Sequence, residues 1–136
     1  MKNIVLDTNC LLACIAVRNK FHTIWNAFLN EEFYLSISNE IITEYEEILA
    51  EKTSPEFAEM IVYIILNSNN VVFVHPYFRF GLITADPDDN KMADCAISAN
   101  VDYLVTNDRH FNVLKNIDFP KINVIDLDTF RRLIAM

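Results

Sequence analysis

The chain has 136 residues, of which 52% are hydrophobic and 22% are charged, and it contains one glycine and four prolines. This composition excludes disordered and fibrous proteins and predicts a single compact domain over residues 1–136. The formal net charge of −8 argues against a protein that holds nucleic acid on a broad basic surface.

The cellular compartment is predicted from two further features. The start of the sequence lacks the charged and apolar parts of a signal peptide, and the most apolar stretch, Met60–Leu66, is too short to cross a bilayer. We therefore expect a cytoplasmic protein that does not enter a membrane. Three cysteines cannot all pair with one another, so Cys10, Cys14 and Cys95 are expected to be reduced residues of the core.

Short β-type runs alternate with segments of helical periodicity along the chain. This alternation predicts an α/β domain whose mostly parallel sheet is covered on both faces. Residues 78–85 show no clear pattern beyond an extended stretch with a turn at Gly81. In chain order we expect a strand over 3–6, helices over 11–17 and 23–29, a strand over 33–38, helices over 39–49 and 55–66, a strand over 71–74, a helix over 86–99, strands over 103–106 and 124–125, and a helix over 128–134.

Four acidic motifs flank these elements. Asp7 closes the first strand, Glu44 lies on the helix after the second strand, an acidic run opens the helix over 86–99, and Asp108 follows the strand over 103–106. The carboxyl ends of parallel strands meet at one edge of a sheet, so these acids can converge there. Converging carboxylates repel one another unless a cation bridges them, and hard oxygen ligands select Mg²⁺ or Mn²⁺. The histidines lie outside the motifs, which disfavours zinc.

Each acid also has a purely structural interpretation. Asp7 could cap the helix that follows it, and Asp108 could cap a turn through Phe111. In the acidic run, Asp86, Asp88 and Asp89 all suit a first helical turn, where acids interact favourably with the helix dipole. These residues alone leave open which acid of that run serves a site, with Asp94 further along the same helix as another candidate.

The ordered set of motifs resembles the PIN domain, and within that family the VapC-related toxins of prokaryotic toxin–antitoxin systems. The resemblance rests on Asp7-Thr8-Asn9, on Glu44, on the run Asp-Asp-Asn-Lys-Met-Ala-Asp-Cys-Ala over 88–96, and on Val-Thr-Asn-Asp over 105–108. It implies a three-layer α/β/α sandwich and an Mg²⁺- or Mn²⁺-dependent ribonuclease that hydrolyses phosphodiester bonds. It also implies an RNA substrate, an antitoxin partner and a homodimer. The implied catalytic and metal-binding residues are Asp7, Glu44, Asp89 and Asp108, and the supporting residues are Asn9, Asp94, Thr106 and Asn107.

Other functions remain open at this point. A PIN-like nuclease could process RNA without an antitoxin, or a PIN-like domain could bind a partner without cleaving. A receiver domain is disfavoured because no acid follows the strand ending at Val74, and a haloacid dehalogenase-type phosphatase because Asn9 stands where a second aspartate is required.

Two further expectations concern contacts. Lys91 and His110 are candidate contacts for a phosphate. The homodimer is expected to use apolar surface on two consecutive helices, formed by Tyr45, Phe57, Tyr63 and residues 60–66.

Overall fold

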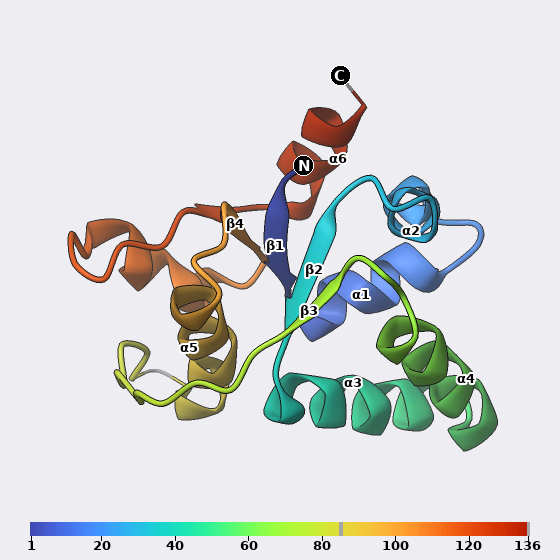
Figure 1. Cartoon of the computed structure of the whole chain (residues 1–136), viewed down its shortest axis with the longest axis horizontal. Coiled ribbons are helices and arrows are strands. Elements are labelled where there is room, and N and C mark those ends of the chain that lie inside the picture. The colour runs from blue at the N-terminus through green and yellow to red at the C-terminus, as the bar shows by residue number, and fades with distance from the viewer. Residues whose placement is uncertain (85, 136) are drawn as a thin grey trace.

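The sheet is parallel throughout. The computed structural model describes residues 1–84 and 86–135, and in it five strands pair in the order β3-β2-β1-β4-β5 (Figure 1). Every neighbouring pair is parallel, and Leu6 at the end of β1 lies opposite Val105 at the end of β4. Asp7, directly after the central strand, is therefore beside the residues that follow β4. The strands are β1 (Asn3–Leu6), β2 (Tyr34–Ile37), β3 (Val71–Phe73), β4 (Tyr103–Val105) and β5 (Val124–Ile125).

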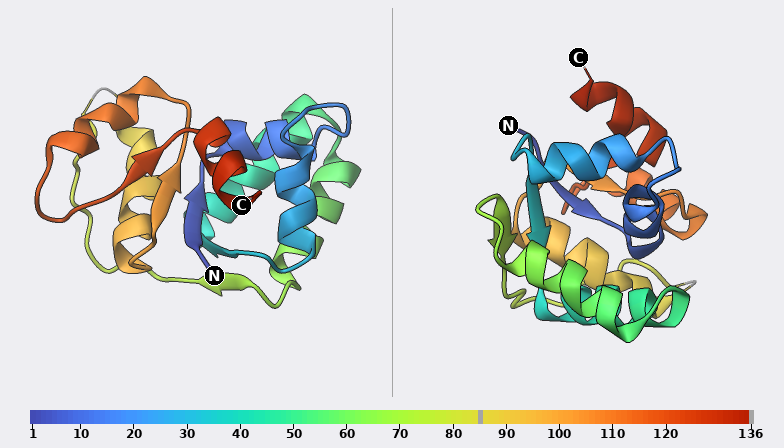
Figure 2. Two further views of the ribbon diagram at one scale, coloured as in Figure 1. Left: turned by 90° about the horizontal axis from the view of Figure 1, so that it is seen from above. Right: turned by 90° about the vertical axis from the view of Figure 1, so that its right-hand side faces the viewer.

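Helices cover both faces of the sheet, as expected for parallel strands joined by helical crossovers. In the right-hand view of Figure 2, α3, α4 and α5 lie on one side, and α2 and α6 lie on the other. The helix α1 packs against both α2 and α3. This arrangement confirms the predicted α/β sandwich. The helices are α1 (Thr8–Ile15), α2 (His22–Leu29), α3 (Asn39–Lys52), α4 (Pro55–Leu66), α5 (Asn90–Ser98) and α6 (Leu127–Ile134), with 3₁₀ turns η1 (Pro87–Asp89) and η2 (Arg109–Asn116).

Several predicted boundaries are wrong, and capping explains two of them. The first helix begins at Thr8 rather than residue 11, because the Asp7 carboxylate accepts the hydrogen bond of the Thr8 N–H and starts the helix at once. The helix predicted over 86–99 opens with the 3₁₀ turn η1, and α5 begins only at Asn90. Residues 78–84 form no regular element, and Ala85, the last residue of that predicted segment, lies outside the described residues.

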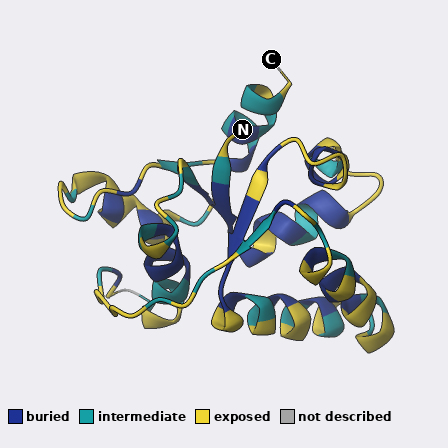
Figure 3. Cartoon of the chain, in the orientation of Figure 1, coloured by how far each residue is buried: buried dark blue, intermediate teal, exposed yellow. Residues whose placement is uncertain are grey.

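The core lies between the sheet and its helices, and it corrects one predicted surface residue. Tyr45 is fully buried, and its hydroxyl donates a hydrogen bond to the Leu6 carbonyl at the end of β1. The prediction that Tyr45 contributes to an exposed association surface is therefore wrong. On α4, Met60, Tyr63 and Leu66 are exposed whereas the side chains between them face the core, a division visible in Figure 3.

A buried asparagine joins three elements at the opposite end of the strands. Asn70, just before β3, is 3% exposed and donates from Nδ2 to the carbonyls of Phe28 and Phe33, at 3.0 and 2.8 Å. Its own carbonyl accepts the N–H of Leu35 in β2 at 2.9 Å. These bonds fix the end of α2 and the starts of β2 and β3 relative to one another.

The cysteines behave as core residues, as predicted. Cys10, Cys14 and Cys95 are free thiols and are buried. Burial raises the pKa of Cys10 and of Cys95 to about 12, so both thiols stay protonated near neutral pH. Within the described residues, no helix is both long and apolar enough to cross a membrane.

Candidate active site

Asp7 is the most buried acid at the carboxyl edge of the sheet. It is 8% exposed, and its Oδ1 accepts the Thr8 N–H at 2.9 Å while Oδ2 accepts the Thr106 hydroxyl at 2.8 Å. Asp7 thus caps α1 and also faces the end of β4. The capping role and the site role proposed for this residue use different oxygens of one carboxylate.

Thr106 holds two acids at once. Besides donating to Asp7, its Oγ1 accepts the backbone N–H of Asp108 at 3.0 Å. Asp108 in turn caps η2, because its Oδ1 accepts the N–H of His110 at 2.9 Å. The single hydroxyl of Thr106 therefore fixes the position of Asp7 relative to the chain that carries Asp108.

The two asparagines predicted to support the site lie at its margin. Asn9 is exposed and, with Asp7, Cys10, Asn107 and Asp108, lines a hollow of about 250 Å³. The Asn107 side chain is used elsewhere, since its Oδ1 accepts the N–H of Leu127 at 3.0 Å and anchors the start of α6. Asn107 thus positions a helix, and its amide does not contact the acids.

Glu44 reaches the same edge from α3. One of its carboxylate oxygens accepts a hydrogen bond from the Thr8 hydroxyl, and the other is 2.9 Å from the Lys91 ammonium. Lys91 also lies 3.2 Å from Asp88. Glu44 and Lys91 share a groove of about 340 Å³ with Asn39, Glu40, Thr43, Glu47 and Asp88.

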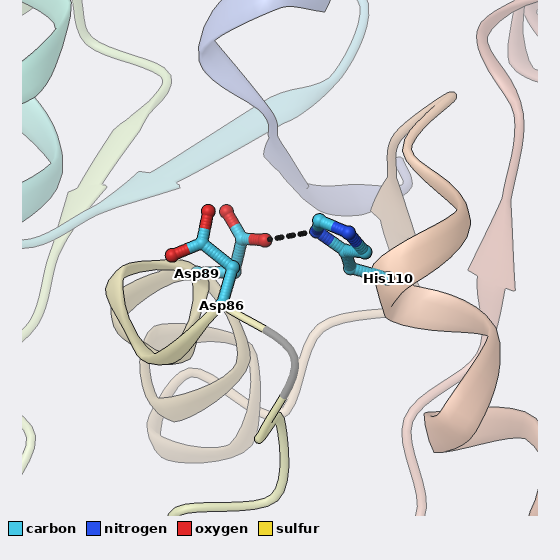
Figure 4. A group of neighbouring side chains, drawn as sticks. All are labelled: Asp86, Asp89 and His110. Atoms are coloured by element: carbon cyan, nitrogen blue, oxygen red, sulfur yellow. Dashed lines mark hydrogen bonds and ion pairs between the residues drawn. The ribbon is translucent and has the colours of Figure 1, made fainter.

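Asp89 lies in a group that sequence reasoning did not assemble. Figure 4 shows Asp86, Asp89 and His110 directed toward one another, with one potential ligand atom from each within 4.8 Å of the others. His110 Nδ1 is 3.4 Å from Asp89 and 3.5 Å from Asp108. Asp86 had seemed only a capping acid, and its Oδ1 does accept the Asp88 N–H at 3.2 Å. The spacing of His110, two residues after Asp108 in a tight turn, was the signal available in the sequence.

Asp94 is placed away from these residues. It is 3% exposed, and its Oδ1 accepts the backbone N–H of Phe80 at 3.3 Å, with the positive charge of Arg79 nearby. Asp94 lies five positions after Asp89 on α5, on a different face of the helix. Its contacts indicate that it secures the extended segment before η1.

The acids influence one another electrostatically. Burial raises the pKa of Asp7, and the charges of Glu44 and Asp108 add to that effect, although hydrogen bonds from Thr106 and Thr8 oppose it. Burial likewise raises the pKa of Asp89 to about 6, with further contributions from Asp86, Asp108 and Asp7. The carboxylates predicted from the sequence therefore lie close enough to repel.

This donor set fits a divalent cation. It offers several carboxylate oxygens and one imidazole nitrogen, and it carries an excess of negative charge that a cation would neutralise. The residues able to hold such an ion are Asp7, Glu44, Asp86, Asp89, Asp108 and His110.

The raised pKa of Asp89 predicts how stability depends on pH without metal. Between the ordinary value of 3.8 and about 6, the unfolded chain has released the Asp89 proton while the folded chain retains it. Stability should therefore fall as pH rises through this range. Thermal melts of the metal-free protein at pH 4 to 7 should show a smaller fall for Asp89→Asn than for the wild type. Asp118→Asn, which changes an exposed acid outside the site, should follow the wild-type curve, and a similar flattening there would contradict the assignment to Asp89.

Comparisons with known proteins agree with this geometry. The family profile described as PIN domain matches residues 3–110, a range that contains Asp7, Glu44, Asp89 and Asp108. A comparison with curated proteins finds no match.

Several solved structures share the fold. A chain in the structure of VapBC2 from Rickettsia felis, bound to a DNA fragment from its promoter, is 18% identical with a TM-score of 0.64, over 91% of this chain and 98% of that one. A chain of DNA-bound VapBC from Salmonella typhimurium is 23% identical with a TM-score of 0.61, over 93% and 99%. VapC20 of Mycobacterium tuberculosis, a toxin that cleaves the sarcin–ricin loop, is 15% identical with a TM-score of 0.61, over 85% and 97%.

Proposed function

Because this chain belongs to the PIN domain family, we propose that it is a metal-dependent endoribonuclease and the toxin of a toxin–antitoxin pair. The observation that carries the proposal is the meeting of Asp7, Glu44, Asp89 and Asp108 at one edge of the sheet, where their charges raise the pKa of Asp7 and Asp89. We propose these four residues as the catalytic acids and ligands of Mg²⁺ or Mn²⁺. Such a cation, when bound, would activate water and stabilise charge on the cleaved phosphodiester.

The chain's own residues contribute position rather than a nucleophile. Thr106 orients Asp7, and Thr8 orients Glu44, through hydrogen bonds from their hydroxyls. Cys10 lines the hollow beside Asp7, but its pKa of about 12 keeps it protonated and unreactive. Water is therefore the proposed nucleophile, and the 3′-oxygen is the proposed leaving group.

RNA cleavage tests this proposal directly. The purified protein should cut single-stranded RNA in Mg²⁺ or Mn²⁺, stop in EDTA, and recover when the cation is restored. Attack by water leaves 5′-phosphate and 3′-hydroxyl ends, which end-labelling and mass spectrometry identify. Full activity in EDTA, or 2′,3′-cyclic phosphate products, would show that the 2′-hydroxyl or another group performs the attack. RNA binding without any cleavage would favour the non-cleaving alternative.

We propose an antitoxin as the protein partner, because two of the similar structures are VapBC complexes. The acidic groove around Glu44 and Asp88 suits a basic segment of such a partner. Both proteins would act in the cytoplasm, where RNA is available. A small gene next to this one, encoding a DNA-binding segment and a basic tail, would support the pair, and its product should co-purify with this chain and inhibit cleavage. A solitary gene would favour RNA processing instead.

We also propose a homodimer that uses the exposed face of α4. Met60, Tyr63 and Leu66 are 49%, 67% and 48% exposed, and they form an apolar strip along the helix. Light scattering at micromolar concentration should give the mass of a dimer for the wild type and of a monomer for Tyr63→Lys. Val113→Lys, a matched change at an exposed apolar residue of η2, should leave the mass unchanged. A monomeric wild type would remove the homodimer from the proposal.

A further inference from the structure

The groove around Glu44 contains a positive charge supplied by the chain itself. Lys91, in the first turn of α5, reaches across to α3 and places its ammonium 2.9 Å from Glu44 Oε1 and 3.2 Å from Asp88 Oδ1. The Lys91 side chain is only 15% exposed, and that of Glu44 is 21% exposed. This ion pair is far more enclosed than the pair between Lys20 and Asp128, whose side chains are 64% and 39% exposed.

Both oxygens of Glu44 are already engaged. Oε1 accepts from Lys91, and Oε2 accepts from the Thr8 hydroxyl. A divalent ion that bound Glu44 would have to displace the ammonium or share the carboxylate with it, and two cations so close together repel.

The other half of the site differs. Asp7 accepts hydrogen bonds from Thr8 and Thr106, and Asp89 lies near His110, but among the described ion pairs neither acid contacts a lysine or an arginine. The carboxylates of Asp7, Asp89 and Asp108 thus retain the charge that attracts a divalent ion.

We propose that Lys91 is a built-in cation that occupies the place of a second divalent ion at Glu44. The metal-free groove would then take a single divalent ion, at Asp7, Asp89 and Asp108. This inference rests on the proposed function, because it assumes that the acids bind a cation. It makes Lys91 a residue that determines how many ions the site holds. The phosphate contact predicted for Lys91 from the sequence would require the ammonium to leave Glu44.

Calorimetric titration of the metal-free, full-length protein with Mn²⁺ tests the inference without an activity measurement. The wild type and Lys91→Arg should bind one equivalent, because arginine keeps the positive charge. Lys91→Met keeps the aliphatic stem but removes the charge, and it should bind a second equivalent. Lys52→Met removes the same charge from the exposed end of α3 and should still bind one. A single equivalent on Lys91→Met, or two on the wild type, would overturn the role given to Lys91.

A second variant keeps the test decisive if Lys91→Met does not fold. Glu44→Gln in the otherwise unchanged protein should alter the dissociation constant of the first Mn²⁺ by less than about threefold, since Lys91 rather than the ion occupies Glu44. Asp7→Asn should weaken the same ion by about tenfold or more. A large loss in Glu44→Gln would contradict the inference while leaving the nuclease proposal intact. Failure of every variant to bind Mn²⁺ would overturn the nuclease proposal and the inference together.

Discussion

Replacing Asp7 by asparagine should reduce RNA cleavage by at least about a thousandfold. Asp7 is the central acid of the site, since it follows the middle strand and its pKa is affected by both Glu44 and Asp108. Asparagine has nearly the same shape, but it cannot supply the negative charge that the cation requires. Single-turnover cleavage of a labelled single-stranded RNA in saturating Mn²⁺ measures the loss. Retention of more than a tenth of the activity would remove Asp7 from the catalytic acids.

The same variant should be at least as stable as the wild type when no metal is present. The asparagine carbonyl can still accept the Thr8 N–H, so the cap of α1 survives, and one of several repelling charges disappears. Asp7→Ala serves as the matched comparison, because it removes the same charge together with the cap and should cost about 1 kcal/mol relative to Asp7→Asn. Equal loss of stability in both variants would mean that the charge of Asp7 stabilises the fold.

Replacing Asn70 by aspartate should destabilise the fold by about 3 kcal/mol or more, which corresponds to a melting temperature lower by roughly 10 °C. The Asn70 amide donates to two carbonyl oxygens, and its own Oδ1 has no hydrogen-bond partner among the described residues. A carboxylate would face both carbonyls without a proton to donate.

The pH dependence identifies the cause of that loss. A buried aspartate at position 70 would have a raised pKa, so the folded variant would hold a proton that the unfolded chain releases. Its stability should then fall further at pH 8 than at pH 5. Asn69→Asp adds the same charge at the exposed neighbouring position and should change the melting temperature little. Similar losses in the two variants would point to overall charge rather than to the buried hydrogen bonds.

Local sequence patterns were sufficient to predict the layers and the acids that follow strands. The runs at 3–6 and 103–106 are short, apolar and rich in β-formers, so their pairing at the centre of a parallel sheet and the positions of Asp7 and Asp108 at its edge follow from general rules. Glu44 was predicted because it lies between core-facing positions of a helix. In these cases one element and its neighbour in sequence carry all the information.

Contacts between distant segments could not be predicted in the same way. The pairing of Lys91 with Glu44 depends on how α5 packs against α3, and the approach of His110 to Asp89 depends on the 3₁₀ turn η2. Tyr45 illustrates the converse error. Its place in an apolar helical stripe was clear, but whether that stripe faced the core or a second subunit depended on the hydrogen bond between its hydroxyl and Leu6.

The strand order also determines when the site can form during synthesis. β1 is the first strand to leave the ribosome, but its partner β4 and the residues Thr106 and Asp108 are made much later. A nascent chain that ends before residue 103 already carries Asp7, Glu44 and Asp89, yet the Asp7 carboxylate still lacks its bond from Thr106. The site is thus incomplete until the last third of the chain has emerged. A ribosome is therefore shielded from this nuclease for most of the time that it takes to make it, and products of interrupted translation are expected to be harmless.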